Sequence, residues 1–126
     1  MNINQLDHLV LTVNDIEQTC RFYQNILGME VIEFLGGRKA LCFGNQKFNL
    51  HQVGKEFEPK AEKPTSGAID LCLVSDTPIN EIIAELAKHS IPIIEGPIER
   101  TGATGTLISV YIRDPDKNLI EISNYV

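Results

Sequence analysis

The strongest constraint on this chain is an internal repeat, because a chain that repeats one order of elements folds as two similar modules. Residues 8–14 resemble residues 70–76, a shift of 62 (from 8 to 70). Residues 49–51 resemble residues 119–121, a shift of 70 (from 51 to 121), which assigns the eight additional residues to a second-half loop around 96–105. The two halves agree more closely in the order of their predicted helices and strands than in their amino-acid identities.

The first half reads as a strand, a helix and three further strands. Residues 6–13 are rich in β-branched and apolar side chains and predict a strand. Asp15 followed by Gln18 resembles a capping box, and Gly28 is placed to end the helix. Apolar and turn residues then predict strands near 30–35, 38–44 and 47–53.

The second half repeats this order. Residues 68–75 predict a strand, followed by a helix with Thr77 as N-cap and Pro78 at its first position. The charged segment 57–66, which contains two prolines, predicts a linker between module 1 (about 1–56) and module 2 (about 67–126) of a single domain. The remaining strands are expected near 92–95, 106–113 and 118–124.

Two βαβββ modules define the expected fold. Each module buries one face of its sheet under a helix and leaves the other face open. We therefore predict an α+β fold, in which the paired modules form an open, curled mixed sheet around a cleft. Such a cleft is a natural site for a small ligand.

Strand alternation places four ligand-type side chains on the open faces, each in an otherwise apolar strand: His8, His51, Asp70 and Glu121. An imidazole or a carboxylate there is costly to bury without a partner, and a divalent cation supplies one. Two imidazoles and a carboxylate favour Fe(II) and also suit Zn, Mn or Ni. We expect His8, His51 and Glu121 to ligate one such ion, with Asp70 as a further ligand or a group that orients one.

Composition excludes several other classes. The net charge of −6 and the pI of about 5.0 argue against nucleic acid as a partner. No apolar run approaches the length of about 20 residues that spans a bilayer, and the first residues do not resemble a signal peptide. Three cysteines without C-x-x-C spacing indicate reduced core residues in a cytoplasmic protein: Cys20, Cys42 and Cys72.

Two motifs carry a family resemblance. Residues 8–13, together with Phe22-Tyr23 and Leu27-Gly28-Met29, resemble the glyoxalase I signature. Residues 111–121, with Asp114-Pro115 and Glu121, look like the closing motif of the same superfamily. The chain thus resembles the vicinal oxygen chelate superfamily over nearly its whole length, and most of all its small bacterial glyoxalase/dioxygenase-like proteins and the glyoxalase-domain-containing protein 5 branch.

The resemblance implies paired βαβββ modules, usually in a homodimer, around one divalent metal ion. It also implies that His8, His51 and Glu121 stand at metal-ligand positions. Glyoxalase I usually has Glu at the place of His51 and His or Glu at the place of Asp70. Lys117 replaces the usual turn glycine, which implies backbone strain because that turn requires a positive φ.

Three function classes remain open. The leading one is a metal-dependent lyase or isomerase resembling lactoylglutathione lyase, which stabilises the enediolate of a small vicinal-oxygen substrate, such as a thiol adduct. The second is an extradiol-type Fe(II) dioxygenase, although residues 101–109 lack the histidine of that signature. The third is a metal-free protein that sequesters an antibiotic.

Roles follow for the residues around the expected cleft. Glu121 is the candidate catalytic base, and Asp70 is the second candidate. Tyr111 and Ser109 share a strand face and are expected to line the substrate pocket. Arginines in turns or loops are expected to hold an anionic part of the substrate: Arg38 and Arg100.

Overall fold

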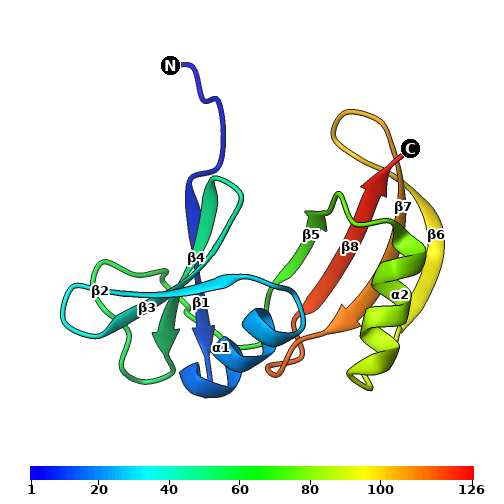
Figure 1. Ribbon diagram of the computed structural model, residues 1–126. Coiled ribbons are helices and arrows are strands. Elements are labelled where there is room, and N and C mark those ends of the chain that lie inside the picture. Colours follow the sequence, from blue (N-terminus) through cyan, green and yellow to red (C-terminus); the bar gives the residue numbers. More distant parts are fainter. The chain divides into compact units, whose positions relative to one another are not determined.

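The computed structural model describes residues 1–126 and divides into two compact units, Met1–Gly67 and Ala68–Val126. Each unit is a βαβββ module with one four-stranded mixed sheet and one helix (Figure 1). The α+β class and the repeated order of elements predicted from the sequence are therefore confirmed. Neither helix is long and apolar enough to cross a membrane.

Unit 1 has its helix packed on one face of the sheet β1-β4-β3-β2. Its elements are β1 (His8–Val13), α1 (Ile16–Asn25), β2 (Glu30–Phe34), β3 (Arg38–Phe43) and β4 (Gln46–Gln52). β1 runs parallel to β4, and the other neighbours are antiparallel. The core under α1 consists of buried side chains from both layers: Leu11, Val13, Tyr23, Leu41, Phe48 and Leu50.

The start of α1 follows the capping rule read from the sequence. The Asp15 side chain accepts a hydrogen bond from the Gln18 backbone N–H at 3.1 Å, because the first N–H groups of a helix have no partner within it. Tyr23 is fully buried and packs its ring edge-to-face against Phe22 and Phe48. The helix is therefore fixed at its first turn and along its buried side.

Unit 2 repeats the architecture with the sheet order β5-β8-β7-β6. Its elements are β5 (Asp70–Val74), α2 (Ile79–Lys88), β6 (Glu95–Thr101), β7 (Thr106–Arg113) and β8 (Leu119–Tyr125). β5 runs parallel to β8, as β1 does to β4. Buried side chains of the sheet and of α2 form the core: Ile82, Leu86, Val110, Ile112, Ile120 and Ile122.

The start of α2 differs from the prediction by one residue. Pro78 has the extended ψ of 141°, so the helix begins at Ile79 and Thr77 is not its N-cap. No side chain caps this helix, and Asn124 holds the preceding loop instead: its side-chain amide donates to the carbonyl oxygens of Ser75 and Thr77, each at 2.9 Å. The connection into α2 is therefore held by the last strand of the unit.

A second difference concerns the strand expected near 92–95. The strand is β6, which begins at Glu95 and runs through Gly96-Pro97, residues assigned to a loop from their composition. The pairing with β7 shifts register between Glu95 and Ile98, which is a β-bulge. A Cβ at position 96 would lie 2.3 Å from the Ser109 carbonyl oxygen, so glycine is needed for this close approach.

The repeat itself has a slightly different offset in the last strand of each unit. His8 pairs with Lys47, and Asp70 pairs with Leu119, so β4 and β8 superimpose at a shift of 72 (from 47 to 119) rather than 70. Gln52 supports this shift. Its side-chain oxygen accepts from the Ile16 N–H, and its side-chain nitrogen donates to the Asn14 carbonyl oxygen. Asn124, 72 residues later, likewise donates to the loop before the helix of unit 2. Asn49, and not His51, is thus the structural counterpart of Glu121.

The turn between β7 and β8 is built around a buried carboxylate. Asp114 accepts hydrogen bonds at 2.9 Å from the backbone N–H groups of Asp116 and Asn118, and at 2.8 Å from the Asn118 side chain. Asn118 in turn accepts from the Ile69 N–H at 2.9 Å, which ties the start of β5 to this turn. Lys117 takes a φ of +71°, as the replaced turn glycine implied.

Lys117→Gly should therefore stabilise the protein. A left-handed backbone costs a non-glycine residue about 1–2 kcal/mol, and the greater freedom of glycine in the unfolded chain offsets part of the gain. We expect an increase of about 0.5–1 kcal/mol in the free energy of unfolding, measured by urea titration. Lys117→Ala is the matched control: it removes the same side chain but keeps the strain, and an equal gain for Ala would contradict this explanation.

Candidate functional site

The open face of unit 1 carries His8 on β1 and Asn49 on β4. The His8 Nδ1 lies 2.8 Å from Asp7 Oδ1, which orients the ring and leaves Nε2 for another partner. Asn49 lies two positions beyond the register partner of His8, and diagonal neighbours of this kind are about 7–8 Å apart at Cα. The Asn49 Oδ1 atom is buried and accepts no hydrogen bond. This face therefore presents an oriented imidazole beside an unsatisfied carbonyl oxygen.

Lys47 is the cation nearest to His8 in the register, and its direction matters for any ion there. Its ammonium lies 4.5 Å from the centroid of the Phe34 ring, on β2. Because β2 and β1 are the opposite edges of the sheet, the Lys47 side chain extends away from His8. The approach to His8 and Asn49 is thus not blocked by this charge.

His51 is placed elsewhere on the same face. It pairs with Thr12, four positions along β1 from His8, which corresponds to about 13 Å along the strand. Two imidazoles that bind one ion must bring their nitrogens to about 2.0–2.1 Å from it. The register of unit 1 therefore places His51 farther from His8 than Asn49 is, and His51 as a ligand stays a prediction.

The open face of unit 2 carries Asp70 and Glu121 in the same diagonal relation. Asp70 pairs with Leu119, so Glu121 lies two positions beyond its register partner. Asp70 is exposed, and Glu121 is partly buried. Each unit thus supplies a pair of donor side chains at one repeated place: His8 with Asn49, and Asp70 with Glu121.

A chain of hydroxyl groups holds the Glu121 carboxylate. Ser109 Oγ donates to Glu121 Oε2 at 2.7 Å, and the Oγ atoms of Ser109 and Ser123 lie 2.6 Å apart. Since the Ser109 proton goes to the carboxylate, Ser123 must donate to Ser109, and the Cys72 thiol, 3.3 Å from Ser123, completes the chain. Both serines are fully buried, so the carboxylate is held by rigid donors.

Tyr111 and Arg100 complete this polar network. Arg100 Nε donates to the Tyr111 hydroxyl at 2.9 Å, and Arg100 also lies 3.4 Å from Glu95. Burial raises the pKa of Tyr111 above its ordinary value, the Arg100 bond opposes this rise, and a hydrogen bond to Glu121 adds to it. Tyr111 therefore stays protonated near neutral pH. Arg100, expected in a loop, lies in β6 and is already paired.

Each unit presents its own pair of donor groups that suit a divalent ion. A cluster of three or more His, Cys, Asp or Glu side chains that could hold a metal is not present. One imidazole, one unpartnered amide oxygen and two carboxylates are nevertheless a mixed nitrogen and oxygen set, which suits Fe, Mn, Ni or Zn. The orphaned Asn49 oxygen is the observation that favours a cation, because a buried acceptor without a partner is costly.

The segment 57–66, predicted as a linker, packs on unit 1. Phe57 lies edge-to-face on His51, with ring centroids 5.5 Å apart, and the Arg38 guanidinium lies 3.8 Å from the Phe57 centroid. Ser66 Oγ donates to Asn14 Oδ1 at 3.3 Å, which fixes the other end of the segment. Residues 57–66 therefore form a strap, defined here as the segment that crosses the open face of unit 1.

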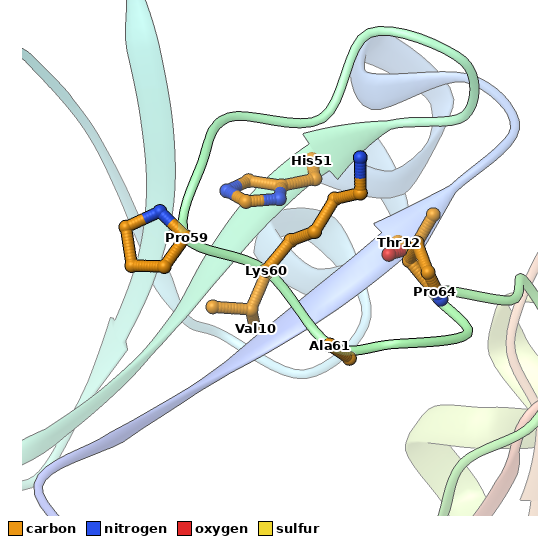
Figure 2. A pocket seen from close by; sticks show the side chains of 7 residues that line it. All are labelled: Val10, Thr12, His51, Pro59, Lys60, Ala61 and Pro64. Carbon is orange, nitrogen blue, oxygen red and sulfur yellow. The ribbon is translucent and has the colours of Figure 1, made fainter.

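A pocket of about 400 Å³ lies between the strap and the sheet. Figure 2 shows the side chains that line it: Val10 and Thr12 from β1, His51 from β4, and Pro59, Lys60, Ala61 and Pro64 from the strap. Burial lowers the pKa of His51 below its ordinary value, and the nearby Arg38 lowers it further. The imidazole is therefore neutral at pH 7.

Strand alternation places Asn49 on the open face, but the sequence did not single out Asn49 as a donor, nor Phe57 or Lys60 as residues of a site. An asparagine in a strand gave no signal, because the repeat was aligned two residues away from the offset that the register shows. Phe57 and Lys60 lay in a segment whose prolines and charges resemble a solvated linker. An aromatic residue within such a segment was the available sign that it packs on a surface.

A family model matches residues 5–122: the Glyoxalase/Bleomycin resistance protein/Dioxygenase superfamily. The chain belongs to this superfamily. It is 59% identical over 126 residues to Virulence protein STM3117 of Salmonella typhimurium, covering 100% of this chain and 88% of that protein. It is 53% identical over 125 residues to Glyoxalase domain-containing protein RDO1 of Mycosarcoma maydis, covering 99% of this chain and 70% of that protein.

Solved structures agree with this membership. The crystal structure of STM3117 matches with a TM-score of 0.99 and covers 100% of both chains. A lactoylglutathione lyase from Agrobacterium tumefaciens matches with a TM-score of 0.75 at 22% identity, covering 98% and 95% of the two chains. TnmS3, an antibiotic binding protein from Streptomyces sp. CB03234, matches with a TM-score of 0.75 at 19% identity, covering 100% and 99%. The last two matches show the shared fold alone, and this fold accommodates both a lyase and a binding protein.

The buried neutral His51 predicts a pH-dependent stability. Its pKa in the folded protein lies below the unfolded value of about 6.5, so the unfolded chain binds the extra proton. The stabilisation is complete above pH 6.5 and is lost as the pH falls toward the folded pKa. We expect the stability difference between wild type and His51→Gln to change by up to about 1.4 kcal/mol per pH unit in this window.

Urea unfolding at pH 8, 7, 6 and 5.5 measures this difference. Gln24→Ala, on the exposed side of α1, carries no titrating change and serves as the control for general pH effects. Parallel pH profiles for wild type and His51→Gln would contradict the neutral, buried state of this imidazole.

Proposed function

We propose that this protein is a divalent-metal-dependent lyase or isomerase of the glyoxalase type. Its substrate is a small molecule with two neighbouring oxygens, such as a thiol adduct. The observation that carries the proposal is the donor pair repeated on the open face of each unit, His8 with Asn49 and Asp70 with Glu121. Membership of a superfamily in which one structural neighbour is a lactoylglutathione lyase supports it.

The proposed ligands are His8, Asn49 and Glu121, with Asp70 as a fourth ligand or as the group that orients one. Asn49 replaces His51 in this set, because the register separates His51 from His8. When bound, Fe, Mn, Ni or Zn acts as a Lewis acid toward two vicinal oxygens.

The residues of the chain then supply the proton transfer. Glu121 takes the proton from the hydroxyl-bearing carbon beside a carbonyl, exchanges it with solvent, and gives a proton to the neighbouring carbonyl carbon. The hydroxyl proton passes from the first oxygen to the second, so the step is a 1,2-shift with no change in total oxidation state. Ser109 holds one carboxylate oxygen, so Glu121 keeps its direction during the transfer. Asp70, exposed on the same face, is the second candidate base.

Other residues on the open faces position the substrate. The protonated Tyr111 hydroxyl accepts from Arg100 and donates to Glu121; when a substrate binds, it can turn this proton from Glu121 to a negatively charged substrate oxygen. Arg38 remains a candidate for holding an anionic part of the substrate. A cytoplasmic location agrees with the three free thiols.

The ligand set is tested by metal affinity, independently of any reaction. We expect one Mn²⁺ or Zn²⁺ per donor set by isothermal titration calorimetry of chelator-treated protein. Glu121→Gln, His8→Ala and Asn49→Ala should each weaken binding about 10–100-fold, because the first removes the negative charge of a ligand and the other two remove a donor. His51→Ala should change the affinity less than threefold.

His89→Ala is the matched histidine control, since His89 pairs with Glu85 on α2 and lies off the open faces. A large loss of affinity for His51→Ala with none for Asn49→Ala would restore His51 as the ligand and reject Asn49. Failure of native protein to bind any divalent ion at micromolar concentration would favour the sequestration class.

The reaction class is tested with the hemithioacetal of glutathione and a 2-oxoaldehyde, in D₂O and under strict anoxia. We expect metal-dependent formation of the thioester with solvent deuterium in the product, and equal rates with and without oxygen. Glu121→Gln should lower kcat at least about 100-fold, the usual scale for loss of a positioned general base. Turnover that requires O₂ would reject the lyase and support the dioxygenase alternative.

A further inference from the structure

The pocket under the strap borders the donor pair of unit 1 and extends away from His8 along the sheet. Three of its lining residues come from the sheet: Val10 is the register partner of Asn49, and Thr12 and His51 lie about 13 Å along the strands from His8. The pocket is also confined to unit 1. The function proposed above does not use it, and the inference below stands whether or not an ion binds.

The chemistry of the lining identifies a class of ligand. Val10, Pro59, Ala61 and Pro64 offer methyl groups and proline rings, which favour an apolar body. Lys60 brings an ammonium group to the same space, and Thr12 and His51 bring a hydroxyl and an imidazole. The Arg38 guanidinium, stacked on Phe57, adds positive charge behind His51. Glu58 and Glu56 lie nearby, but Lys60 is the charged side chain that lines the pocket itself, which favours a carboxylate over a cationic ligand.

The ion pair of Lys60 and the anchoring of the strap both affect how strongly such a ligand binds. The Lys60 ammonium lies 2.8 Å from Glu58 Oε1, with its side chain 35% exposed and that of Glu58 73% exposed. An exposed pair of this kind is weak, so a ligand carboxylate that is partly sheltered from water competes with Glu58 for Lys60. The strap is held at both ends, by Phe57 on His51 and by Ser66 on Asn14, so little ordering accompanies binding.

We propose that the pocket between the strap and the open face of unit 1 binds a small carboxylate with an apolar body, its anionic group directed to Lys60 and its body against Val10, Ala61 and the proline rings. Lys60 is the attractive residue, and Glu58 is its internal competitor. This assigns the segment between the two units a direct part in binding a ligand.

The test uses 4-methylbenzoate as the probe and 4-methylbenzamide as its neutral match. The full-length protein is titrated with each in the presence of EDTA, so that chelation by a bound ion does not contribute. Binding is followed by backbone amide shifts in two-dimensional NMR. We expect saturable shifts for the benzoate at residues 10, 12, 51, 60 and 61, with a Kd at least about tenfold lower than for the benzamide.

Two charge variants should change the Kd of the benzoate in opposite directions, and a third serves as their control. Lys60→Met should raise the Kd of the benzoate about tenfold and leave that of the benzamide unchanged. Glu58→Gln should lower the benzoate Kd about threefold, because it releases Lys60. Lys63→Met, which makes the same charge change on the strap but does not line the pocket, is the matched control and should have no effect.

A steric variant tests the location. Ala61 is exposed, so Ala61→Phe should keep the fold and its Tm while its ring fills the pocket and abolishes the shifts for both probes. Equal binding of benzoate and benzamide, or an unchanged Kd in Lys60→Met, would overturn the anionic assignment. Shifts outside the pocket, or none in the millimolar range, would overturn the site itself. Loss of metal binding in the earlier experiment would leave these outcomes unaffected.

Discussion

The parallel pairing of the first and last strands is the constraint on which each unit depends. It decides which side chains of β1 lie beside those of β4, and which of β5 lie beside those of β8. The pairing is fixed by side-chain amides at equivalent places, Gln52 in unit 1 and Asn124 in unit 2, each bonded to the loop that enters the helix. A register change would break these bonds and separate the donor pairs, so the geometry of the open faces rests on two neutral residues outside them.

The sequence predicted which face of the sheet a side chain lies on, but not the register between neighbouring strands. Side chains alternate with a period of two, so His8, Asp70 and Glu121 could be assigned to open faces from the letters alone. Offsets of 70 and 72 residues between β4 and β8 are both even, so they place the same side chains on the open face, and the amino-acid sequence does not distinguish them. Only the pairing between β1 and β4 shows that Asn49, rather than His51, is the counterpart of Glu121. The proposed ligand set therefore differs from the predicted one at one position, with Asn49 in place of His51, because this assignment depends on the register.

Segments rich in proline and glycine were the other source of error. Gly96-Pro97 begins β6, because a bulge brings the backbone against Ser109 where no side chain fits. The strap has the composition of a solvated linker, yet Phe57 is stacked between Arg38 and His51. In both cases a tertiary contact, which local propensity does not include, decides the structure. The N-cap was predicted correctly at Asp15 and one residue too early at Thr77, because Pro78 has an extended ψ and the helix begins at Ile79.

The turn at the end of β7 bears on how mutational data for this superfamily are interpreted. Asp114 and Asn118 are buried and bonded to each other, and Asn118 also holds the backbone of Ile69, directly before Asp70. In a saturation-mutagenesis screen scored by cell phenotype, these two positions would tolerate as little change as a residue that contacts substrate. Their intolerance would come from backbone anchoring, and a screen that also records protein abundance would separate them from Glu121.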